Sequence, residues 1–165
     1  MAEWLRSGLQ SRVRRFDSGR RLVSEESVQI AQEWYERLGR MLDEYWADPV
    51  PFEQWAGVDE LFKHTHPDAE WLALLRRDPL HGRDEWVEQL IDWLDALDDW
   101  RVSFEEATDL GGDQALVVSR ISVRGKGSGL EVDQRLFTVV TVRDGKIAAI
   151  HDYAEREQAL AAAGP

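Results

Sequence analysis

The sequence predicts an α+β fold in which a curved antiparallel sheet wraps around N-terminal helices and encloses a conical pocket. Helical periodicity dominates the first hundred residues, whereas the later segments are rich in Val, Ile, Phe and Thr. Glycine-containing turns separate those later segments, as is usual in antiparallel sheets. A length of 165 residues and a hydrophobic content of 43% suit a single domain with its own core.

The first long helix is expected to begin at Ser24, because Ser24 can cap the first turn and two glutamates follow it. Pro49 and Pro51 predict that this helix ends near Asp48. Its apolar side chains recur at helical spacing, at Val28, Ala31, Trp34, Tyr35, Leu38, Leu42 and Tyr45.

One or two further helical turns are expected within residues 51–64, and a strand is expected over 68–75. The clearest helical pattern covers residues 82–100. Its apolar stripe consists of Trp86, Leu90, Trp93, Leu94, Leu97 and Trp100. Because apolar stripes usually face inward, we expect this helix to pack on the sheet, although regularly spaced tryptophans are also typical of a binding surface.

Four strands and a short helix complete the predicted fold. The strands are expected over residues 101–110, 114–125, 130–145 and 146–153. Asp144 and Gly145 predict a tight hairpin. The GKGSG segment predicts a flexible hairpin rather than a phosphate-binding loop, because no helix opens after it. The closing helix is expected to stop at Gly164.

Charge is distributed unevenly along the chain. Residues 1–23 carry six arginines and two acidic residues, so this basic arm has a charge of +4 and the rest has −16, for a total of −12. An acidic body argues against nucleic acid as the main partner. The arm is expected either to be a solvated N-terminal extension or to bind an anionic partner.

Composition also bears on location and cofactors. The chain has no cysteine, which excludes disulfides, thiolate metal sites and cysteine nucleophiles, and is compatible with a cytoplasmic protein. We find neither a secretory leader nor an apolar stretch of about 20 residues, so no membrane span is expected. No cofactor is expected.

The segment GKIAAIHDYAE, residues 145–155, raises the main functional question. Strand alternation places Asp152 on the same face as Ala148 and Ile150, which should be buried. The carboxylate therefore either faces a cavity or lies at the end of the strand without a function.

The segments HPDAEWLALLRRDPLHGRDEWVEQL and GSGLEVDQRLFTVVTVRDGKIAAIHDYAEREQALAAAG resemble a SnoaL-like domain. This family belongs to the nuclear-transport-factor-2-like (cystatin-like α+β) superfamily, which includes polyketide cyclases, ketosteroid isomerases and limonene epoxide hydrolases. The resemblance is strongest over residues 58–164, and residues 39–57 look like an insertion. We therefore expect a basic N-terminal extension over 1–23 and a single SnoaL-like domain over 24–165.

The resemblance implies different site residues for each enzyme. The pocket Asp and Arg of the epoxide hydrolases fall on Asp152 and Arg120. Their acid falls on Ser122, and their water-binding residues fall near Leu72 and Leu74. Hydrolysis of that kind needs both an acid and a base, so the resemblance does not imply it here.

The other two enzymes are matched in part. The base of the ketosteroid isomerases falls near Ala73, and their protonated oxyanion-hole Asp falls near Thr138. Their phenolic donor matches Trp34 or Tyr35. Polyketide cyclases use an acidic group in the same cavity, and Asp152 is the candidate for that role.

Arg120 and Asp152 are accordingly the candidate catalytic residues. An arginine beside a buried aspartate favours the ionised carboxylate, whether the pair is catalytic, anchors a ligand or only ties two strands together. If both face the cavity, strand alternation predicts a mostly apolar lining. The expected lining residues are Trp34, Tyr35, Leu38, Tyr45, Trp71, Val118, Ser122, Gln134, Leu136, Thr138 and Val140.

Three histidines have weaker implications. His64 and His66 alternate as metal ligands can, but the family has an ordinary connection there, and we expect no metal site. His151 is expected on the outer sheet face, which in this family commonly packs against a second subunit, so we expect a homodimer. That face also carries Arg135, Phe137 and Val139.

Two functional hypotheses follow. The first is a non-catalytic protein whose apolar pocket binds a small lipophilic molecule, or which binds only a partner chain. It rests on the missing catalytic residues. The alternative is an acid/base enzyme, similar to the cyclases, isomerases or hydrolases, that uses Asp152 with Arg120.

Overall fold

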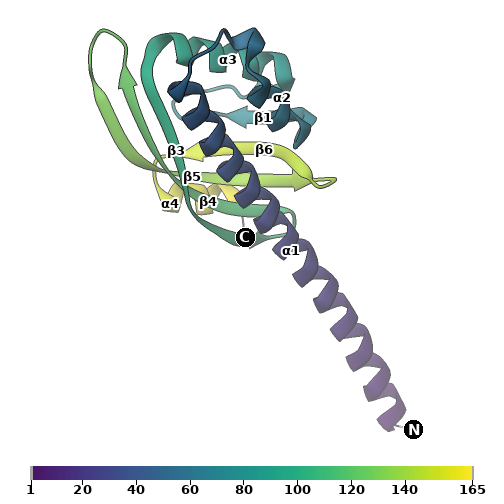
Figure 1. The fold of residues 1–165 in the computed structure, drawn as a ribbon. Helices are drawn as coiled ribbons and strands as arrows, with labels where there is room; N and C mark the ends of the chain where they lie inside the picture. The colour runs from purple at the N-terminus through teal and green to yellow at the C-terminus, as the bar shows by residue number, and fades with distance from the viewer. Residues whose placement is uncertain (1, 165) are drawn as a thin grey trace.

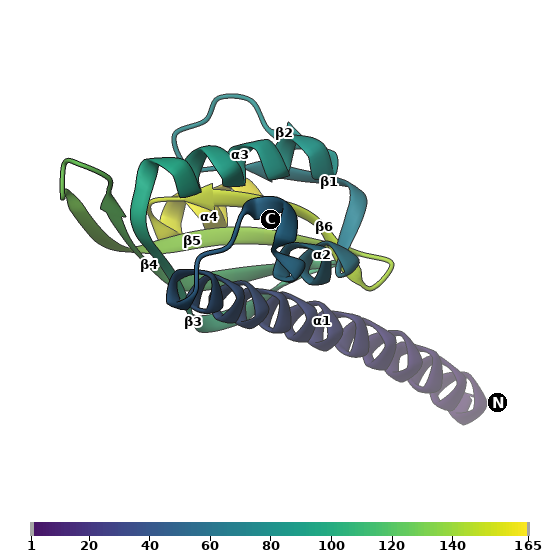
Figure 2. The same ribbon diagram turned by 45° about the horizontal axis from the view of Figure 1, so that its top comes forward.

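A curved six-stranded sheet carries α1, α2 and α3 on its concave face and α4 on its outer face (Figures 1 and 2). The structure is a computed structural model that describes the backbone of residues 2–164 and the side chains of residues 25–164. The elements are α1 (Ala2–Ala47), the 3-10 helix η1 (Phe52–Gln54), α2 (Ala56–Lys63), β1 (Thr65–Leu72), β2 (Leu80–His81), α3 (Gly82–Ala96), β3 (Leu97–Gly111), β4 (Gln114–Gly125), β5 (Glu131–Arg143), β6 (Lys146–Tyr153) and α4 (Arg156–Ala163).

The strand order in the sheet is β2-β1-β6-β5-β4-β3. All neighbouring strands are antiparallel except β1 and β6, which are parallel. The β5–β6 hairpin turns at Asp144 and Gly145, whose φ angles of 54° and 71° fit the mirror-image turn that matches strand twist. The predicted α+β architecture and this hairpin are therefore confirmed.

The main core lies between the concave face and the first three helices. It is tied at one point by a polar link, because the Trp34 indole donates to Thr65 Oγ1 at 3.0 Å and that hydroxyl donates to the Leu61 carbonyl at 3.0 Å. Both side chains are buried, so each polar group is satisfied without water. The link fixes α1 against the start of β1, beside the cavity described below.

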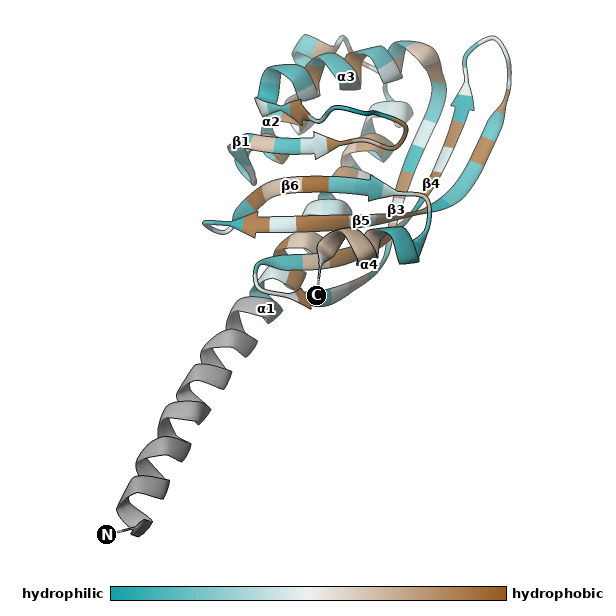
Figure 3. Ribbon diagram, turned by 180° about the vertical axis from the view of Figure 1, so that it is seen from behind, coloured by the Kyte–Doolittle hydropathy of each residue, from teal (hydrophilic) through white to brown (hydrophobic). Residues whose placement is uncertain are grey.

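The outer sheet face has a small core of its own. Ala159 of α4 packs on Leu116 and Val139, and all three side chains are at most 5% exposed. Figure 3 shows α4 lying across this face, over β5. The central strands are therefore apolar on both faces where α4 covers them.

Several element boundaries differ from the sequence prediction. The helix expected from Ser24 begins at Ala2, and residues 1–23 contain no proline that would end it. The short strand β2 was not predicted, and β1 begins three residues earlier than expected, at Thr65. A role for the basic arm lies outside the residues with described side chains.

The helix predicted over residues 82–100 ends at Ala96. Residues from Leu97 onward join β3, because they pair with β4 in a long antiparallel ladder. Trp100 and Val102 are buried there, two residues apart as on one face of a strand. The apolar residues of this segment therefore also followed a two-residue repeat, which overlapped the helical repeat. Among the described residues, no helix combines the length and apolar character needed to cross a membrane.

Candidate functional site

A cavity of about 100 Å³ lies between the concave sheet face and the helices. Its walls come from α1, α2, α3 and from every strand except β2. The lining residues are Trp34, Tyr35, Leu38, Leu61, Trp71, Leu74, Trp86, Leu90, Trp93, Trp100, Val102, Ser119, Ile121, Leu136, Ile150 and Asp152. The lining is almost wholly apolar, and Asp152 is the one ionisable carboxyl group that residues 25–164 contribute to it.

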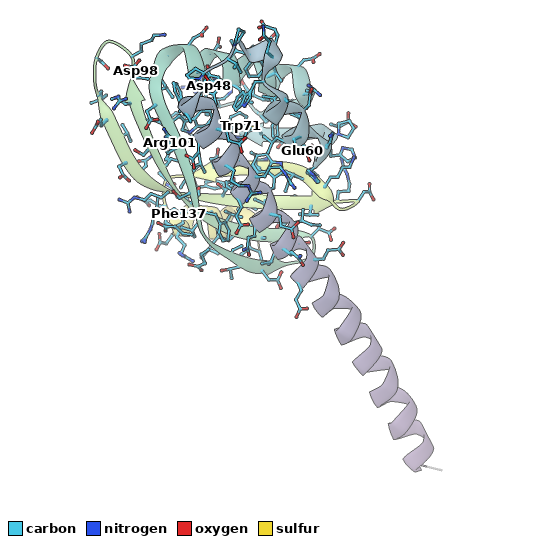
Figure 4. All side chains as sticks on the ribbon, in the orientation of Figure 1. Asp48, Glu60, Trp71, Asp98, Arg101 and Phe137 are labelled. Carbon is cyan, nitrogen blue, oxygen red and sulfur yellow. The ribbon has the colours of Figure 1, made fainter. Side chains whose placement is uncertain are left out.

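Five tryptophans dominate the walls of this cavity. Trp71 is labelled within the body of the protein in Figure 4. Its ring centroid lies 5.4 Å from that of Trp86 and 5.1 Å from that of Trp93. Trp34 lies at one end of this row of rings, with its ring centroid 6.4 Å from that of Trp86. Trp100 lies at the other end, with its ring centroid 5.1 Å from that of Trp93. These contacts are edge-on or tilted, which is the favoured geometry for aromatic pairs, so the rings form a connected and well-packed wall.

Asp152 is held at the cavity by two hydrogen bonds from neutral donors. The Trp71 indole donates to Oδ2 at 2.9 Å, and the Thr138 hydroxyl donates to Oδ1 at 2.7 Å. Thr138 lies opposite Asp152 in the β5–β6 ladder and is fully buried. The carboxyl group is therefore fixed in position by one residue from each of its two neighbouring strands.

The surroundings favour a proton on this carboxyl group. Burial raises the pKa of Asp152, and the bonds from Trp71 and Thr138 offset part of the increase. Tyr35 of α1 lies in the same cluster. Burial raises the pKa of Tyr35 well above its usual value, the charge of Asp152 raises it further, and a hydrogen bond with Thr138 opposes the increase. A carboxyl, a hydroxyl and a phenol thus adjoin one another at the cavity.

This raised pKa gives a pH-dependent contribution to stability. The contribution of Asp152 is fully present below its unfolded pKa of about 4, and it is lost as the pH rises through the higher folded pKa. We expect Asp152→Asn to remove that loss. Urea unfolding of both proteins from pH 3 to 8 should show the free energy of unfolding of the wild type falling relative to the variant. A constant difference, or one of opposite sign, would contradict the account.

Six of the predicted site residues do line the cavity, and these are Trp34, Tyr35, Leu38, Trp71, Leu136 and Asp152. Thr138 lies directly behind the lining and bonds to Asp152. Val140 is fully buried in the main core. Gln134 lies opposite Ile121 in the sheet but is not among the lining residues. Tyr45 packs instead on Trp46 and Trp55, with ring centroids 5.0 and 4.7 Å away.

The expected pairing of Arg120 with Asp152 is wrong. Arg120 Nε lies 2.7 Å from Asp133 Oδ1, and about half of each side chain is exposed. Ser119 and Ile121 are the residues of β4 that face the cavity, so the alternate position Arg120 faces outward. Arg120 therefore forms a surface ion pair between β4 and β5 and does not reach the cavity.

The same error affects the other β4 predictions. Val118 and Ser122 share the outward parity of Arg120, and neither lines the cavity. Residues 115–119 are all buried, because α4 covers part of the outer face. Alternation of apolar and polar residues therefore does not identify the inner face of this strand.

Sequence reasoning missed Ser119, whose side chain is buried at the cavity and whose Oγ has no hydrogen-bond partner among the described side chains. It also missed Trp86, Trp93 and Trp100 as cavity residues, although all had been assigned to an inward stripe. The signal that could have identified them is the presence of four tryptophans between residues 71 and 100, three of them on the stripe that was expected to pack on the sheet.

The histidines have other partners. His66 Nδ1 lies 3.1 Å from the Arg143 guanidinium, and His64 Nε2 lies 3.6 Å from Glu60. His151 Nε2 lies 2.5 Å from Glu70 Oε1, on the face away from the cavity. Within residues 25–164, no group of three His, Cys, Asp or Glu side chains is arranged to hold a metal ion.

Comparison with known proteins identifies this architecture. A family model for the SnoaL-like domain matches residues 52–150. No curated protein matches the chain.

Solved structures match over most of their own length. An NTF2-like protein of unknown function from Burkholderia pseudomallei is 14% identical, with a TM-score of 0.60 over 85% of this chain and 98% of its own. A putative SnoaL-like polyketide cyclase from Jannaschia is 18% identical, with a TM-score of 0.58 over 87% and 95%. TerC, co-crystallised with polyporic acid, is 16% identical, with a TM-score of 0.59 over 82% and 98%. At these identities the likeness concerns the fold.

Proposed function

Because the chain belongs to the SnoaL-like domain family, whose fold hosts several chemistries, we propose its function from the cavity itself: it binds a small, largely apolar molecule beside Asp152. The observation that carries this proposal is a tryptophan-walled cavity that ends at a fixed carboxyl group. Ligand pockets usually combine apolar walls with a few polar groups that orient the ligand.

The volume of the cavity limits the size of the ligand. At about 100 Å³ it is smaller than the roughly 300 Å³ at the lower end of ordinary ligand pockets. The five tryptophans fill much of the cone. A molecule with fewer than about ten non-hydrogen atoms fits this space, whereas a polycyclic substrate requires the wall to open. Leu74, Trp93, Ile121 and Asp152 are the half-buried wall residues, and such an opening would begin among them.

Acid/base catalysis is the second candidate function. It is favoured by the raised pKa of Asp152 and by the adjoining hydroxyls of Thr138 and Tyr35. Arg120 takes no part in this version, because its charge is used on the outer face by Asp133. In this version Asp152 is the acid/base group, and the phenol of Tyr35 donates a hydrogen bond. Binding remains the preferred function because acid/base catalysis usually needs two positioned ionisable groups, and burial raises the pKa of Tyr35 well above its usual value.

Toluene tests the binding proposal without depending on catalysis. We expect it to raise the unfolding temperature and to bind with a dissociation constant of roughly 1 mM or tighter. Asp152→Asn should bind toluene equally well, because toluene contacts only the walls. Titration followed by protein NMR would measure both constants. No binding to either protein would contradict the proposal.

A homodimer through the outer sheet face is part of the same proposal, with one change. Because α4 covers Leu116 and Val139, a second copy would contact α4 and the flanking strands rather than the centre of the sheet. Leu160 on α4 is 44% exposed and would be part of that contact. A cytoplasmic location remains a prediction.

A further inference from the structure

Asp152 has no cationic partner among the residues with described side chains. No Lys, Arg or His nitrogen of residues 25–164 lies within the 4.0 Å that defines an ion pair with its carboxylate. Its neighbour His151 pairs with Glu70 on the other face of the sheet, and the charge of His151 only partly offsets the rise that burial causes in the pKa of Asp152. Asp152 is half-buried at the cavity, and charges withdrawn from water are normally paired in proteins, so a counter-ion from outside the chain would stabilise its ionised form.

The cavity walls are suited to a positive charge. Five tryptophans line the same cavity as Asp152, and these are Trp34, Trp71, Trp86, Trp93 and Trp100. The electron-rich faces of tryptophan rings attract cations more strongly than those of any other side chain, and such cages recognise quaternary ammonium groups. A methylated ammonium also has an apolar exterior, which matches walls that offer few hydrogen bonds.

The overall charge acts in the same direction. The chain carries a net charge of −12, which attracts cations and lowers the local concentration of anions. Among the described residues no basic side chain lines the cavity, so a small anion would find no opposite charge there and would be repelled by an ionised Asp152. Charge therefore disfavours small carboxylates and phosphates as ligands of this site.

We propose that the ligand of the cavity is a small organic cation, with a methylated ammonium group held between the tryptophans and the Asp152 carboxylate. This inference rests on the proposed binding function and specifies its ligand class. The ammonium supplies the missing counter-ion, and its methyl groups contact the rings. Trp71 and Thr138 hold the carboxylate in place by donating to its two oxygens.

A pair of probes of equal shape tests this proposal. Choline and 3,3-dimethylbutan-1-ol differ in one central atom, a charged nitrogen in the first and a neutral carbon in the second. The hydroxyl group that they share cancels in the comparison. We expect the wild type to bind choline at least tenfold more tightly than the alcohol, as measured by titration calorimetry at pH 8 and low salt.

Two variants separate the local charge from the charge of the whole protein. Asp152→Asn should weaken the binding of choline at least tenfold more than it changes the binding of the alcohol, so that the preference for choline disappears. Asp133→Asn removes one negative charge from the outer face, where it pairs with Arg120, and should keep the preference. Thermal unfolding of both variants without ligand would check that each is folded.

The outcomes distinguish this inference from the proposal on which it rests. If the alcohol binds the wild type as tightly as choline, the apolar site stands and the cationic ligand class is wrong. If choline is preferred but equally so by Asp152→Asn, the counter-ion argument is wrong. If neither probe binds the wild type, both the ligand class and the proposed binding function are overturned.

Discussion

Gly39→Ala is expected to lower the free energy of unfolding by about 1–3 kcal/mol, the usual range for overpacking a buried contact. A Cβ atom on Gly39 would lie 2.5 Å from the backbone oxygen of Val102, which belongs to β3 and cannot move like a flexible side chain. Helix propensity alone predicts the opposite sign, a gain of about 1 kcal/mol on replacing glycine in a helix. The sign of the effect therefore tests whether α1 and β3 pack this closely.

Urea unfolding measures this effect, and Arg40→Ala is its control. Arg40 is the next residue of α1 and is exposed, so its replacement should change stability by no more than about 0.5 kcal/mol. Gly39→Ala should also weaken toluene binding, because α1 carries Tyr35 and Leu38 of the cavity wall. A Gly39→Ala variant as stable as the wild type would show that the helix does not approach the strand in this way.

Leu136→Phe is expected to weaken toluene binding by at least tenfold, which corresponds to about 1.4 kcal/mol. Leu136 lies on β5 opposite Ser119 and lines the cavity, so the larger ring would occupy the space that the ligand needs. The folded state should be retained, because the added atoms enter a cavity rather than a filled core.

The same change made elsewhere provides the control for this experiment. Leu160 on α4 is 44% exposed and lies on the outer side of the sheet, so Leu160→Phe should leave toluene affinity unchanged. Unaltered affinity in Leu136→Phe, with toluene still bound to the protein, would place the ligand outside this cavity.

Local signals in the sequence were sufficient to predict most of the fold. Pro49 and Pro51 marked the end of α1, and Asp144 with Gly145 marked the last hairpin. The boundary between α3 and β3 was not predictable in this way. Residues 97–100 continue the helical apolar stripe, and they became a strand because β4 offers a partner along their whole length. Long-range pairing overrode a local pattern.

The candidate site was predictable only where strand parity was unambiguous. On β6 and β5 the positions expected to face inward include Asp152 and Leu136, and these two residues lie at the cavity. On β4, residues 115–118 are all apolar, because both faces of the strand are covered there, so no alternation with polar residues marks the inner face. The assignment of β4 depended on matching Arg120 to an epoxide-hydrolase arginine. This match exchanged the inner and outer faces of the strand. The orphaned hydroxyl of Ser119 could be recognised only from coordinates.

The most direct test of the binding site is a crystal structure of the protein grown with saturating 3,3-dimethylbutan-1-ol. We expect electron density for the alcohol inside the cavity, in contact with Trp71, Trp86 and Leu136. Density for the alcohol only at the surface, with the tryptophan rings closed over an empty or collapsed cavity, would contradict the account.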